Sequence, residues 1–314
     1  MIRQRTVARI LFILMSLVFT AVFSPAEAAT PRLRVSGWTL PFNLPVMVEL
    51  ERGDYARAFS DFDVRTVDLQ SGPKLMAALA AGDLDIVQGI GDAAFLVAAS
   101  EGVDAKILGV NHRSPKAFAV VTNRPEIRSV ADLRGKRVAG LRGSVVHEVF
   151  LDALREAGMT VRDVEFFPMP VAQASATLLA GRVDAALLVG SEILHARKSG
   201  ARVLVDGEGR VRGLSFVVAR GAFLEAHPEV AARFEALRER TLRRIEEEPE
   251  AAARTAAKAT RLDAADIATL AGWYDFSYAL DEEDLRSLEA TKRYLRENRL
   301  LREDVDVASL IYRK

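Results

Sequence analysis

The sequence has no cysteine, only four histidines and no excess of either charge, with 43 basic and 43 acidic side chains among 314 residues. Without cysteine there can be no disulfide, thiolate zinc site, iron–sulfur cluster or cysteine nucleophile. A lipoprotein is excluded as well, because the lipid of a secreted lipoprotein is attached to a cysteine at the cleavage point. Nucleic-acid binding normally leaves a strongly basic face, and the balanced charge gives no sign of one. We therefore expect no nucleic-acid partner.

Charge is also missing from residues 10–23, a run of 14 almost wholly apolar residues preceded by three arginines. The run ends in Ala26-Glu27-Ala28, which has the small-residue pattern of a signal-peptidase site. It is shorter than the roughly 20 residues needed to span a bilayer, which argues against a membrane anchor. We expect residues 1–28 to be a signal peptide, cleaved after Ala28, and the mature protein to be soluble and periplasmic.

Strand-like and helical segments alternate over the first two thirds of the mature chain. Strands are predicted at 33–36, 64–68, 86–89, 105–110, 118–122, 137–139, 164–167, 185–189 and 203–205. Helices are predicted between them at 44–52, 73–81, 93–101, 130–134, 145–157, 171–179 and 192–198. The last third reads as helices only, at 228–247, 249–260, 263–271 and 281–297. This order predicts an α/β fold with mostly parallel sheets, helices on both faces and a helical C-terminal part.

One short pattern occurs twice. Leu79-Ala-Ala-Gly82-Asp-Leu-Asp85 returns 99 residues later as Leu178-Leu-Ala-Gly181-Arg-Val-Asp184. In both places a predicted helix ends at a glycine, which can adopt the left-handed cap, and the chain turns into a buried strand. A generic helix-to-strand loop is the alternative, but the matched spacing favours two homologous α/β lobes.

Catalytic and cofactor motifs are missing. The chain has no HExxH, no P-loop, no Gly-x-Ser-x-Gly and no dinucleotide fingerprint, so we expect neither a metal nor a cofactor. Ser144 and His147 stand three apart at a helix start, and Glu148, the nearby carboxylate, points off another face of that helix. We therefore expect a protein that is not an enzyme.

Binding signals are clearer. Gly143 and Ser144 follow a strand and open a helix, so free backbone N–H groups and the helix dipole favour an anion there. Ser71, Gly72 and Pro73 repeat this arrangement in the other half of the chain. Such helix starts line the ligand crevice of open α/β sheets. The candidate ligand-binding residues are Trp38, Ser71, Gly72, Asp92, Gly143, Ser144, His147 and Glu192. For each, an ordinary helix cap or a packed loop residue is the structural alternative.

These motifs, in this order, resemble the aliphatic sulfonate/taurine/nitrate group of periplasmic substrate-binding proteins. The resemblance rests on Ser71-Gly-Pro-Lys-Leu75, Asp132-Leu-Arg-Gly-Lys-Arg-Val138, Gly143-Ser-Val-Val-His147 and Gly181-Arg-Val-Asp-Ala185, and covers nearly all of the mature chain. It implies a type II periplasmic binding fold that closes on a ligand between two lobes and delivers it to an ABC permease. Where relatives have an aromatic-rich stretch, this chain has Asp184-Ala-Ala-Leu-Leu-Val-Gly-Ser191. Asp92 and Glu192 suggest a zwitterion or a polar heterocycle rather than a simple anion.

The sequence therefore predicts a monomeric solute-binding protein for a small anionic or zwitterionic, sulfonate-like molecule. One lobe is expected to comprise residues 30–117 and 216–314, and the other residues 118–215, with crossing strands at 118–122 and 214–219. Two alternatives stay open: a module that presents its ligand to a membrane sensor, and an enzyme on the same fold, as in pyrimidine- or menaquinone-pathway proteins. The signal peptide argues against the enzyme, because those enzymes are cytoplasmic.

Overall fold

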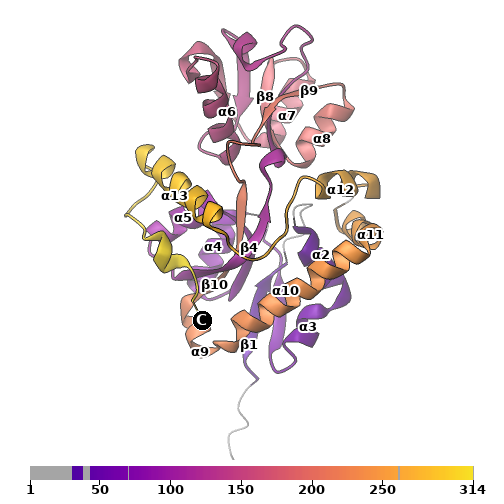
Figure 1. The fold of residues 1–314 in the computed structure, drawn as a ribbon, viewed down its shortest axis with the longest axis vertical. Coiled ribbons are helices and arrows are strands. Elements are labelled where there is room, and N and C mark those ends of the chain that lie inside the picture. The colour runs from indigo at the N-terminus through magenta and orange to yellow at the C-terminus, as the bar shows by residue number, and fades with distance from the viewer. Residues whose placement is uncertain (1–29, 38–42, 70, 261, 314) are drawn as a thin grey trace, which may run out of the picture. The chain divides into compact units, whose positions relative to one another are not determined.

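The computed structural model describes residues 30–37, 43–69, 71–260 and 262–313, and Arg32–Lys314 form one compact unit. The predicted signal peptide and Trp38 lie outside the described residues. The strands gather into two five-stranded sheets, shown with their helices in Figure 1.

The first sheet has the strand order β2-β1-β3-β10-β4. Its strands are β1 (Arg32–Ser36), β2 (Asp63–Val67), β3 (Ile86–Gly91), β4 (Ala105–Arg113) and β10 (Leu214–Arg220). β1 pairs in parallel with β2 and β3, whereas β10 is antiparallel to both β3 and β4. Four strands thus share one direction, and the strand that arrives from the second sheet runs the other way.

The second sheet repeats this arrangement with the order β7-β6-β8-β5-β9. Its strands are β5 (Phe118–Thr122), β6 (Arg137–Gly140), β7 (Glu165–Pro168), β8 (Ala185–Val189) and β9 (Arg202–Asp206). β6 pairs in parallel with β7 and β8, and β5, the strand that arrives from the first sheet, is antiparallel to β8 and β9. The predicted mostly parallel sheets are confirmed.

Helices cover both faces of each sheet, as predicted. The helices between β1 and β4 are α2 (Leu44–Arg52), α3 (Asp54–Ala58), α4 (Gly72–Ala81) and α5 (Asp92–Ser100). Those of the second sheet are α6 (Val145–Glu156), α7 (Val171–Leu179) and α8 (Ser191–Lys198). The C-terminal ones are α9 (Gly221–Ala226), α10 (Glu229–Glu247), α11 (Pro249–Thr260), α12 (Ala264–Ala271) and α13 (Glu282–Glu297). Short 3-10 turns are η2 (Pro115–Ala117), η3 (Val130–Leu133), η4 (Val161–Asp163) and η5 (Val307–Leu310).

Alternating side chains of the strands separate the cores. Phe216 and Val218 of β10 pack in a core with α4, α5 and α13, while Val217 and Ala219 point to the opposite core, with α3, α9 and α10. This is the period-two alternation of a strand buried on both faces. The second sheet likewise has α7 and α8 on one face and α6 on the other. The segment 130–134, predicted as a helix, is a 3-10 turn instead, because Arg134 already leaves the helical conformation, with ψ 122°, and Gly135 follows with φ +70°.

The repeated sequence pattern has the same structural role in both sheets. Gly82 and Gly181 adopt left-handed φ angles of +75° and +69° and end α4 and the turn after α7. The aspartate that follows then binds the strand at the centre of the parallel pairs. Asp85 accepts a hydrogen bond from the backbone N–H of Arg34 at 2.9 Å, and Asp184 accepts one from the backbone N–H of Arg137 at 3.0 Å. Each carboxylate also binds the side chain of that arginine.

The C-terminal segment touches elements of both sheets. α13 packs beside α5, as Figure 1 shows, and Leu288 and Leu295 enter the core of the first sheet. Trp273, just after α12, packs against the core beside α7 and α8 instead, and Lys198 of α8 pairs with Asp266 of α12. The division of the chain at residues 117/118 and 215/216 stays a prediction. In the described part of the chain, no helix combines the length and apolar character needed to cross a membrane.

Candidate functional site

Two crossing segments join the sheets and lie side by side. The first runs from Arg113 at the end of β4 to β5, and the second leads from residue 207 to β10. The backbone N–H of Ser114 lies 3.0 Å from the carbonyl oxygen of Arg212 and 3.2 Å from that of Gly213. Gly213 has φ +62°, and a Cβ there would lie 2.9 Å from the Ser114 backbone. A side chain at position 213 would therefore push the two segments apart.

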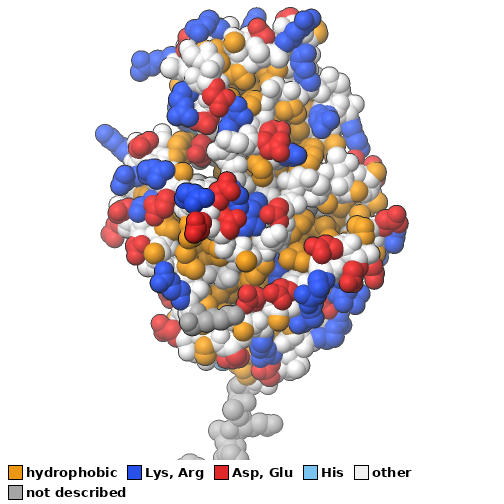
Figure 2. All heavy atoms as spheres, in the orientation of Figure 1, with side chains coloured by type: hydrophobic (Ala, Val, Ile, Leu, Met, Phe, Trp, Pro, Cys, Tyr) orange, Lys and Arg blue, Asp and Glu red, His pale blue; other side chains and the backbone are white. Residues whose placement is uncertain are grey.

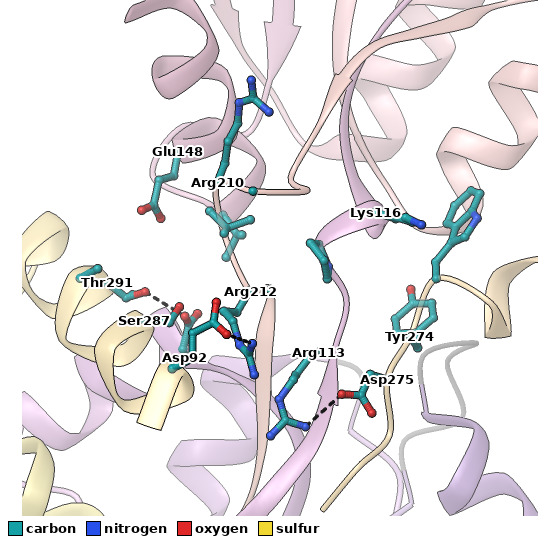
Figure 3. A pocket seen from close by; sticks show the side chains of 18 of the residues that line it. Asp92, Arg113, Lys116, Glu148, Arg210, Arg212, Tyr274, Asp275, Ser287 and Thr291 are labelled. Atoms are coloured by element: carbon teal, nitrogen blue, oxygen red, sulfur yellow. Dashed lines mark hydrogen bonds and ion pairs between the residues drawn. The ribbon is translucent and has the colours of Figure 1, made fainter. Parts of the chain in front are cut away.

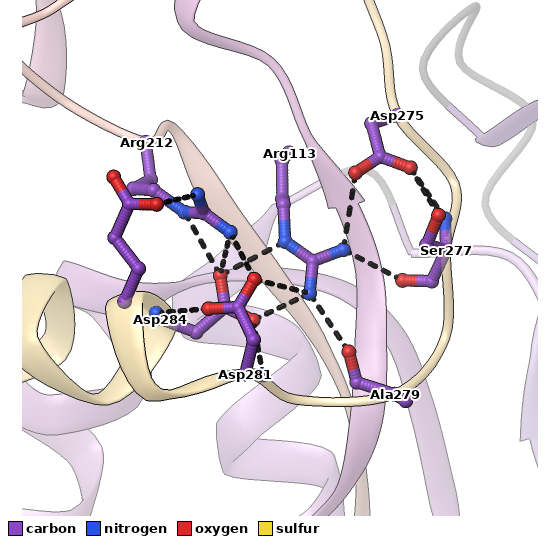
Figure 4. A network of polar contacts seen from close by, with 8 residues as sticks. Arg113, Arg212, Asp275, Ser277, Ala279, Asp281 and Asp284 are labelled. Carbon is purple, nitrogen blue, oxygen red and sulfur yellow. Dashed lines mark hydrogen bonds and ion pairs between the residues drawn. The ribbon is translucent and has the colours of Figure 1, made fainter.

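A network of charged groups ties both crossing segments to the start of α13 (Figure 4). Arg113 and Arg212 share the buried carboxylate of Asp284, whose Oδ1 lies 2.9 Å from Arg113 Nε and 2.8 Å from Arg212 Nη2. Arg212 also pairs with Asp281 at 2.7 Å, and Arg113 donates to the carbonyl of Ser277 at 2.8 Å. The arginines are thereby neutralised and held, so the crossing segments have a fixed position against the C-terminal helix.

A cavity of about 640 Å³, here called the charged cavity, lies above this network (Figure 3). Residues from both sheets and from the C-terminal segment line it. They include Asp92, Arg113, Lys116, Val145, Glu148, Arg210, Arg212, Gly213, Trp273, Tyr274, Asp275, Glu283, Arg286 and Thr291. The basic side chains in this lining have acidic partners: besides the arginines at Asp284, Lys116 pairs with Glu208, Arg210 with Glu156 and Arg286 with Glu282. Figure 2 shows the same intermixing of acidic and basic groups across the visible face.

Glu148 differs from these paired groups. Within the described chain, no hydrogen bond or ion pair joins its carboxylate to another residue, and Figure 3 shows it turned toward Thr291 and Asp92. Burial, together with the nearby charges of Asp92 and Asp152, raises its pKa to about 7. Asp92 is 4% exposed and accepts a hydrogen bond from Thr291 at 2.9 Å, and burial raises its pKa to about 6. The two carboxylates make this end of the cavity favourable for a positive group or a proton.

A second cavity of about 1160 Å³, here called the apolar cavity, adjoins the first. Both are lined by Asp92, Val145, Gly213 and Tyr274. Its polar lining includes His112, Ser114, Ser144 and Ser215. Its apolar lining comes from α4, α5 and the residues around the end of α13, and equally from the second sheet and its helices, through Phe118, Val146, Val171 and Val189. Ser215 is 2% exposed, and its hydroxyl has no hydrogen-bond partner among the described residues. A buried hydroxyl without a partner costs free energy unless a ligand or water satisfies it.

The N-terminus of α6 opens into this apolar cavity. Ser144 is the N-cap residue: its hydroxyl accepts from the backbone N–H of His147 at 3.4 Å and donates to the carbonyl of Leu141 at 2.7 Å. Gly143, before it, has φ +75° and also lines the cavity. The first-turn N–H groups and the dipole of a 12-residue helix form a favourable place for an anion.

The structure does not couple Ser144 to His147 as a nucleophile and base. Ser144 contacts the backbone of His147, while the His147 ring lies 3.5 Å from the Tyr294 hydroxyl through Nδ1 and leaves Nε2 buried without a partner. Burial, and secondarily the charge of Arg142, lowers the pKa of His147 to about 4. The ring is therefore neutral at physiological pH and makes no proton-transfer contact with the hydroxyl.

The predicted ligand-binding residues fall into three groups. Asp92, Gly143 and Ser144 line the cavities, whereas Ser71, Gly72, His147 and Glu192 are not among the lining residues of either one. Trp38 lies outside the described residues. Ser71 does cap α4, but without a side-chain hydrogen bond, and Glu192 is half-buried in the first turn of α8.

Several lining residues were not predicted, and they come from strands β4 and β10, the crossing segments, the helices α4 and α5 and the C-terminal segment. His112 and Ser215 are register partners on β4 and β10, and Tyr274 comes from an irregular stretch after α12. Burial lowers the pKa of His112 to about 3, so it faces the cavity as a neutral group. The predicted crossing strands could have pointed to these residues, because residues where the chain passes from one sheet to the other border the space between the two sheets.

The amino-acid sequence matches two curated proteins with related names. A protein from Escherichia coli K12 that is named an aliphatic sulfonates-binding protein is 32% identical to this chain over 171 residues. The match covers 54% of this chain and 53% of that protein. A Bacillus subtilis 168 protein of the same name is 29% identical over 195 residues, covering 60% and 58%. The chain thus spans little more than half the length of these curated relatives.

Solved structures match over more of the chain. The periplasmic aliphatic sulphonate-binding protein SsuA from Escherichia coli aligns with a TM-score of 0.82 and 25% identity, over 90% of this chain and 97% of its own. The alkanesulfonate-binding protein SsuA from Xanthomonas axonopodis pv. citri, bound to MOPS, aligns with a TM-score of 0.77 and 26% identity, over 91% of this chain and 100% of its own. A desulfurization enzyme, DSZB, shares the fold with a TM-score of 0.69 and 17% identity, over 90% of this chain and 97% of its own. The family model described as "NMT1/THI5 like" matches residues 44–252. The fold expected from the resemblance is confirmed, and the chain belongs to the NMT1/THI5-like family.

Proposed function

We propose that this chain is an extracytoplasmic solute-binding protein of an ABC importer. It would hold a small sulfonate-like anion or zwitterion between its two sheets. The observation that carries the proposal is the N-terminus of α6, where Ser144 opens into a cavity that residues from both sheets line. The names of the relatives, which refer to sulfonate binding, support the same choice of ligand.

The proposed binding mode places the anionic group at the start of α6. There the free N–H groups of the first turn can donate hydrogen bonds, and the Ser144 hydroxyl can do so by turning its hydrogen from the Leu141 carbonyl to the ligand. No side chain has to change its charge. The carboxylates of Asp92 and Glu148, in the adjoining charged cavity, suit the positive group of a zwitterion. A zwitterion therefore uses both cavities, whereas a simple anion uses one.

We propose binding without chemical conversion. DSZB is an enzyme with a similar fold, so the fold alone permits either role. This sequence has no cysteine, and His112, the histidine that lines the apolar cavity, has a pKa lowered to about 3. A general base is most effective when its pKa lies near the working pH, and His112 does not meet that requirement. Glu148, with a pKa of about 7, does meet it, but no hydroxyl among the described residues is hydrogen-bonded to its carboxylate as a nucleophile would be.

The remaining parts of the proposal concern delivery. Residues 30–117 and 216–314 would form one lobe and residues 118–215 the other, and ligand binding would close them as a hinge. The mature protein would be a periplasmic monomer, freed by cleavage after Ala28, that docks on a membrane permease. A permease gene and an ATPase gene beside this one would favour import over presentation to a membrane sensor.

Calorimetry with ethanesulfonate, 2-aminoethanesulfonate and inorganic sulfate tests this proposal. We expect saturable binding of at least one organic sulfonate, with a radius of gyration by small-angle scattering that falls on its addition. Native mass spectrometry of protein purified without denaturation provides a second measurement, through any retained small molecule. Failure of all three probes to bind, with no retained ligand, would contradict the proposed function.

A further inference from the structure

A third cavity lies on the first sheet's side of the molecule, where α2, α3 and α10 meet (Figure 1). Its volume is about 370 Å³, and it is here called the arginine pocket. Four of its lining residues are arginines and one is acidic: Arg52, Arg57, Arg240, Arg244 and Asp54. None of the described residues that line it also lines the charged or the apolar cavity. The arginine pocket is therefore separate from the site proposed for the sulfonate.

The local sequence brings these charges together. α2 ends at Arg52, and Gly53, with φ +65°, turns the chain directly into α3, which begins at Asp54. Arg240 and Arg244 are four residues apart on α10, so they share one face of that helix. α10 packs against both α2 and α3. Like charges at this spacing are destabilising, so the gathered arginines cost free energy unless a negative group lies among them.

Asp54 is the negative group that the lining itself supplies, and it is not sufficient. Its Oδ1 accepts a hydrogen bond from Arg57. Its Oδ2 has no hydrogen-bond partner among the described residues and lies 3.7 Å from Arg52 Nε and 3.6 Å from Arg244 Nη1. No ion pair or hydrogen bond joins Arg240 to another described residue. Four positive charges thus face one carboxylate, and Figure 2 shows several basic side chains over α3 and α10.

We propose that the arginine pocket binds the phosphate group of a small molecule, either inorganic phosphate or a small phosphate monoester. Guanidinium groups present paired N–H donors that match phosphate oxygens. A phosphate monoester carries roughly −1.5 to −2 charges at pH 7, so it offsets more of the excess positive charge than a carboxylate does. The side chains of Arg244 and Arg57 are 34% and 61% exposed, so a ligand can reach them. This site is additional to the proposed function and does not depend on it.

Calorimetry with inorganic phosphate, glycerol 3-phosphate and acetate tests the inference, in a buffer without other multivalent anions. We expect at least one of the two phosphates to bind saturably, with a Kd on the order of 1 mM or below, and acetate to bind at least about tenfold more weakly. No saturable binding of either phosphate, or acetate that binds as tightly, would overturn the inference. Binding to phosphatidylglycerol vesicles without binding of either soluble phosphate would also overturn it.

Variants locate the phosphate. Arg240→Gln and Arg244→Gln should each weaken its binding about tenfold or more and leave the affinity for organic sulfonates unchanged. Arg243→Gln is the matched control on the same helix, because Arg243 is 61% exposed, pairs with Glu239 and does not line the pocket. It removes the same net charge but should not change phosphate binding. An equal loss in all three variants would show an effect of net charge alone and overturn the inference.

Two further measurements separate binding from folding and from the other anion site. Without phosphate, Arg240→Gln should melt no lower than the wild type, because it removes a repulsive charge that has no partner among the described residues. Phosphate should raise the melting temperature of the wild type more than that of this variant. Ser144→Ala should leave phosphate binding unchanged. Phosphate binding that is lost in Ser144→Ala and kept in the arginine variants would place the phosphate at α6, overturning the inference and leaving the proposed function standing.

Discussion

The two sheets have the same strand order, and in each an aspartate after a helix-ending glycine binds an arginine of the neighbouring strand. They differ in the groups that they bring to the cavities. Beyond β3, the first sheet contributes Asp92, a buried carboxylate, whereas beyond β6 the second contributes the free N–H groups at the start of α6. The repeated aspartate–arginine contacts thus hold strands together in both sheets. The groups at the strand ends differ, so the site has a negative side at Asp92 and a positive side at the start of α6.

The sheets also differ in how charge is buried beneath them. Arg238 of α10 and Glu49 of α2 are both fully buried, 3.0 Å apart, in a network that includes Gln88 and Tyr55. Among the described ion pairs, those on the second sheet keep at least one partner partly exposed. The first sheet therefore depends more on a buried polar network than the second does.

The largest expected effect is the loss of that buried pair. Glu49→Ala should lower the free energy of unfolding by about 3–5 kcal/mol, because it leaves the Arg238 charge buried without its carboxylate. Glu51→Ala is the matched control on the same helix: its exposed pair with Lys258 should contribute about 0–1 kcal/mol. Urea denaturation measures both. Similar losses for the two variants would remove this difference between the sheets.

The repeated aspartates allow a direct comparison. Asp85 is 0% exposed and binds Arg34 and Arg220, whereas the side chain of Asp184 is 15% exposed. Asp85→Ala should cost about 2–3 kcal/mol and Asp184→Ala about 1 kcal/mol, because the more exposed arginine–aspartate pair is screened by water. Denaturation curves of the two variants check the order. A larger loss for Asp184→Ala would contradict the burial argument.

The start of α6 can be compared with the start of α4. Ser144→Ala should weaken sulfonate binding by about 1–3 kcal/mol and lower stability by about 1 kcal/mol, because the hydroxyl serves both the ligand and the helix cap. Ser71→Ala should change both by less than about 0.5 kcal/mol, because Ser71 makes no side-chain cap bond and lines neither cavity. Calorimetry and thermal melting separate the two roles. A Ser144 variant that melts lower but binds equally well would make Ser144 a cap only.

A further expected effect depends on pH. The pKa of Glu148, about 7 in the folded state, exceeds its ordinary value of 4.5, so ionisation opposes folding. Stability from this group is complete below about pH 4.5 and is lost as pH rises toward 7. Glu148→Gln should therefore match the wild type at pH 4 and exceed it by about 1–2 kcal/mol at pH 8, after allowance for partial exposure. Chemical denaturation at the two pH values measures this difference in stability between the variant and the wild type. A difference that is the same at pH 4 and at pH 8 would contradict the prediction.

Much of the fold could be predicted because its signals are local. The predicted helices at 44–52, 171–179 and 249–260 and the strands at 118–122 and 185–189 have the observed bounds, since apolar periodicity and cap residues fix them. α3 and α9 were missed, because each is a single short turn held by packing rather than by its own sequence pattern.

The candidate site was harder to predict because it is assembled from distant segments. Ser144 and Asp92 could be named from the strand and helix that flank them. Glu148 was judged only by its position on α6, and Ser215 gave no signal, because their roles depend on α13 and β4 lying alongside. The spacing of residues along one helix cannot predict which side chains of another element those residues will face. The same reason explains Glu192, which the sequence places at a helix start but the structure does not place in either cavity lining.

A crystal structure with butanesulfonate bound tests the central claim most directly. The account predicts sulfonate oxygens within hydrogen-bond distance of the Ser144 hydroxyl and the first-turn N–H groups of α6, with residues of the first sheet contacting the same molecule. A butanesulfonate that contacts only one sheet, or that binds outside the two cavities, would contradict the account.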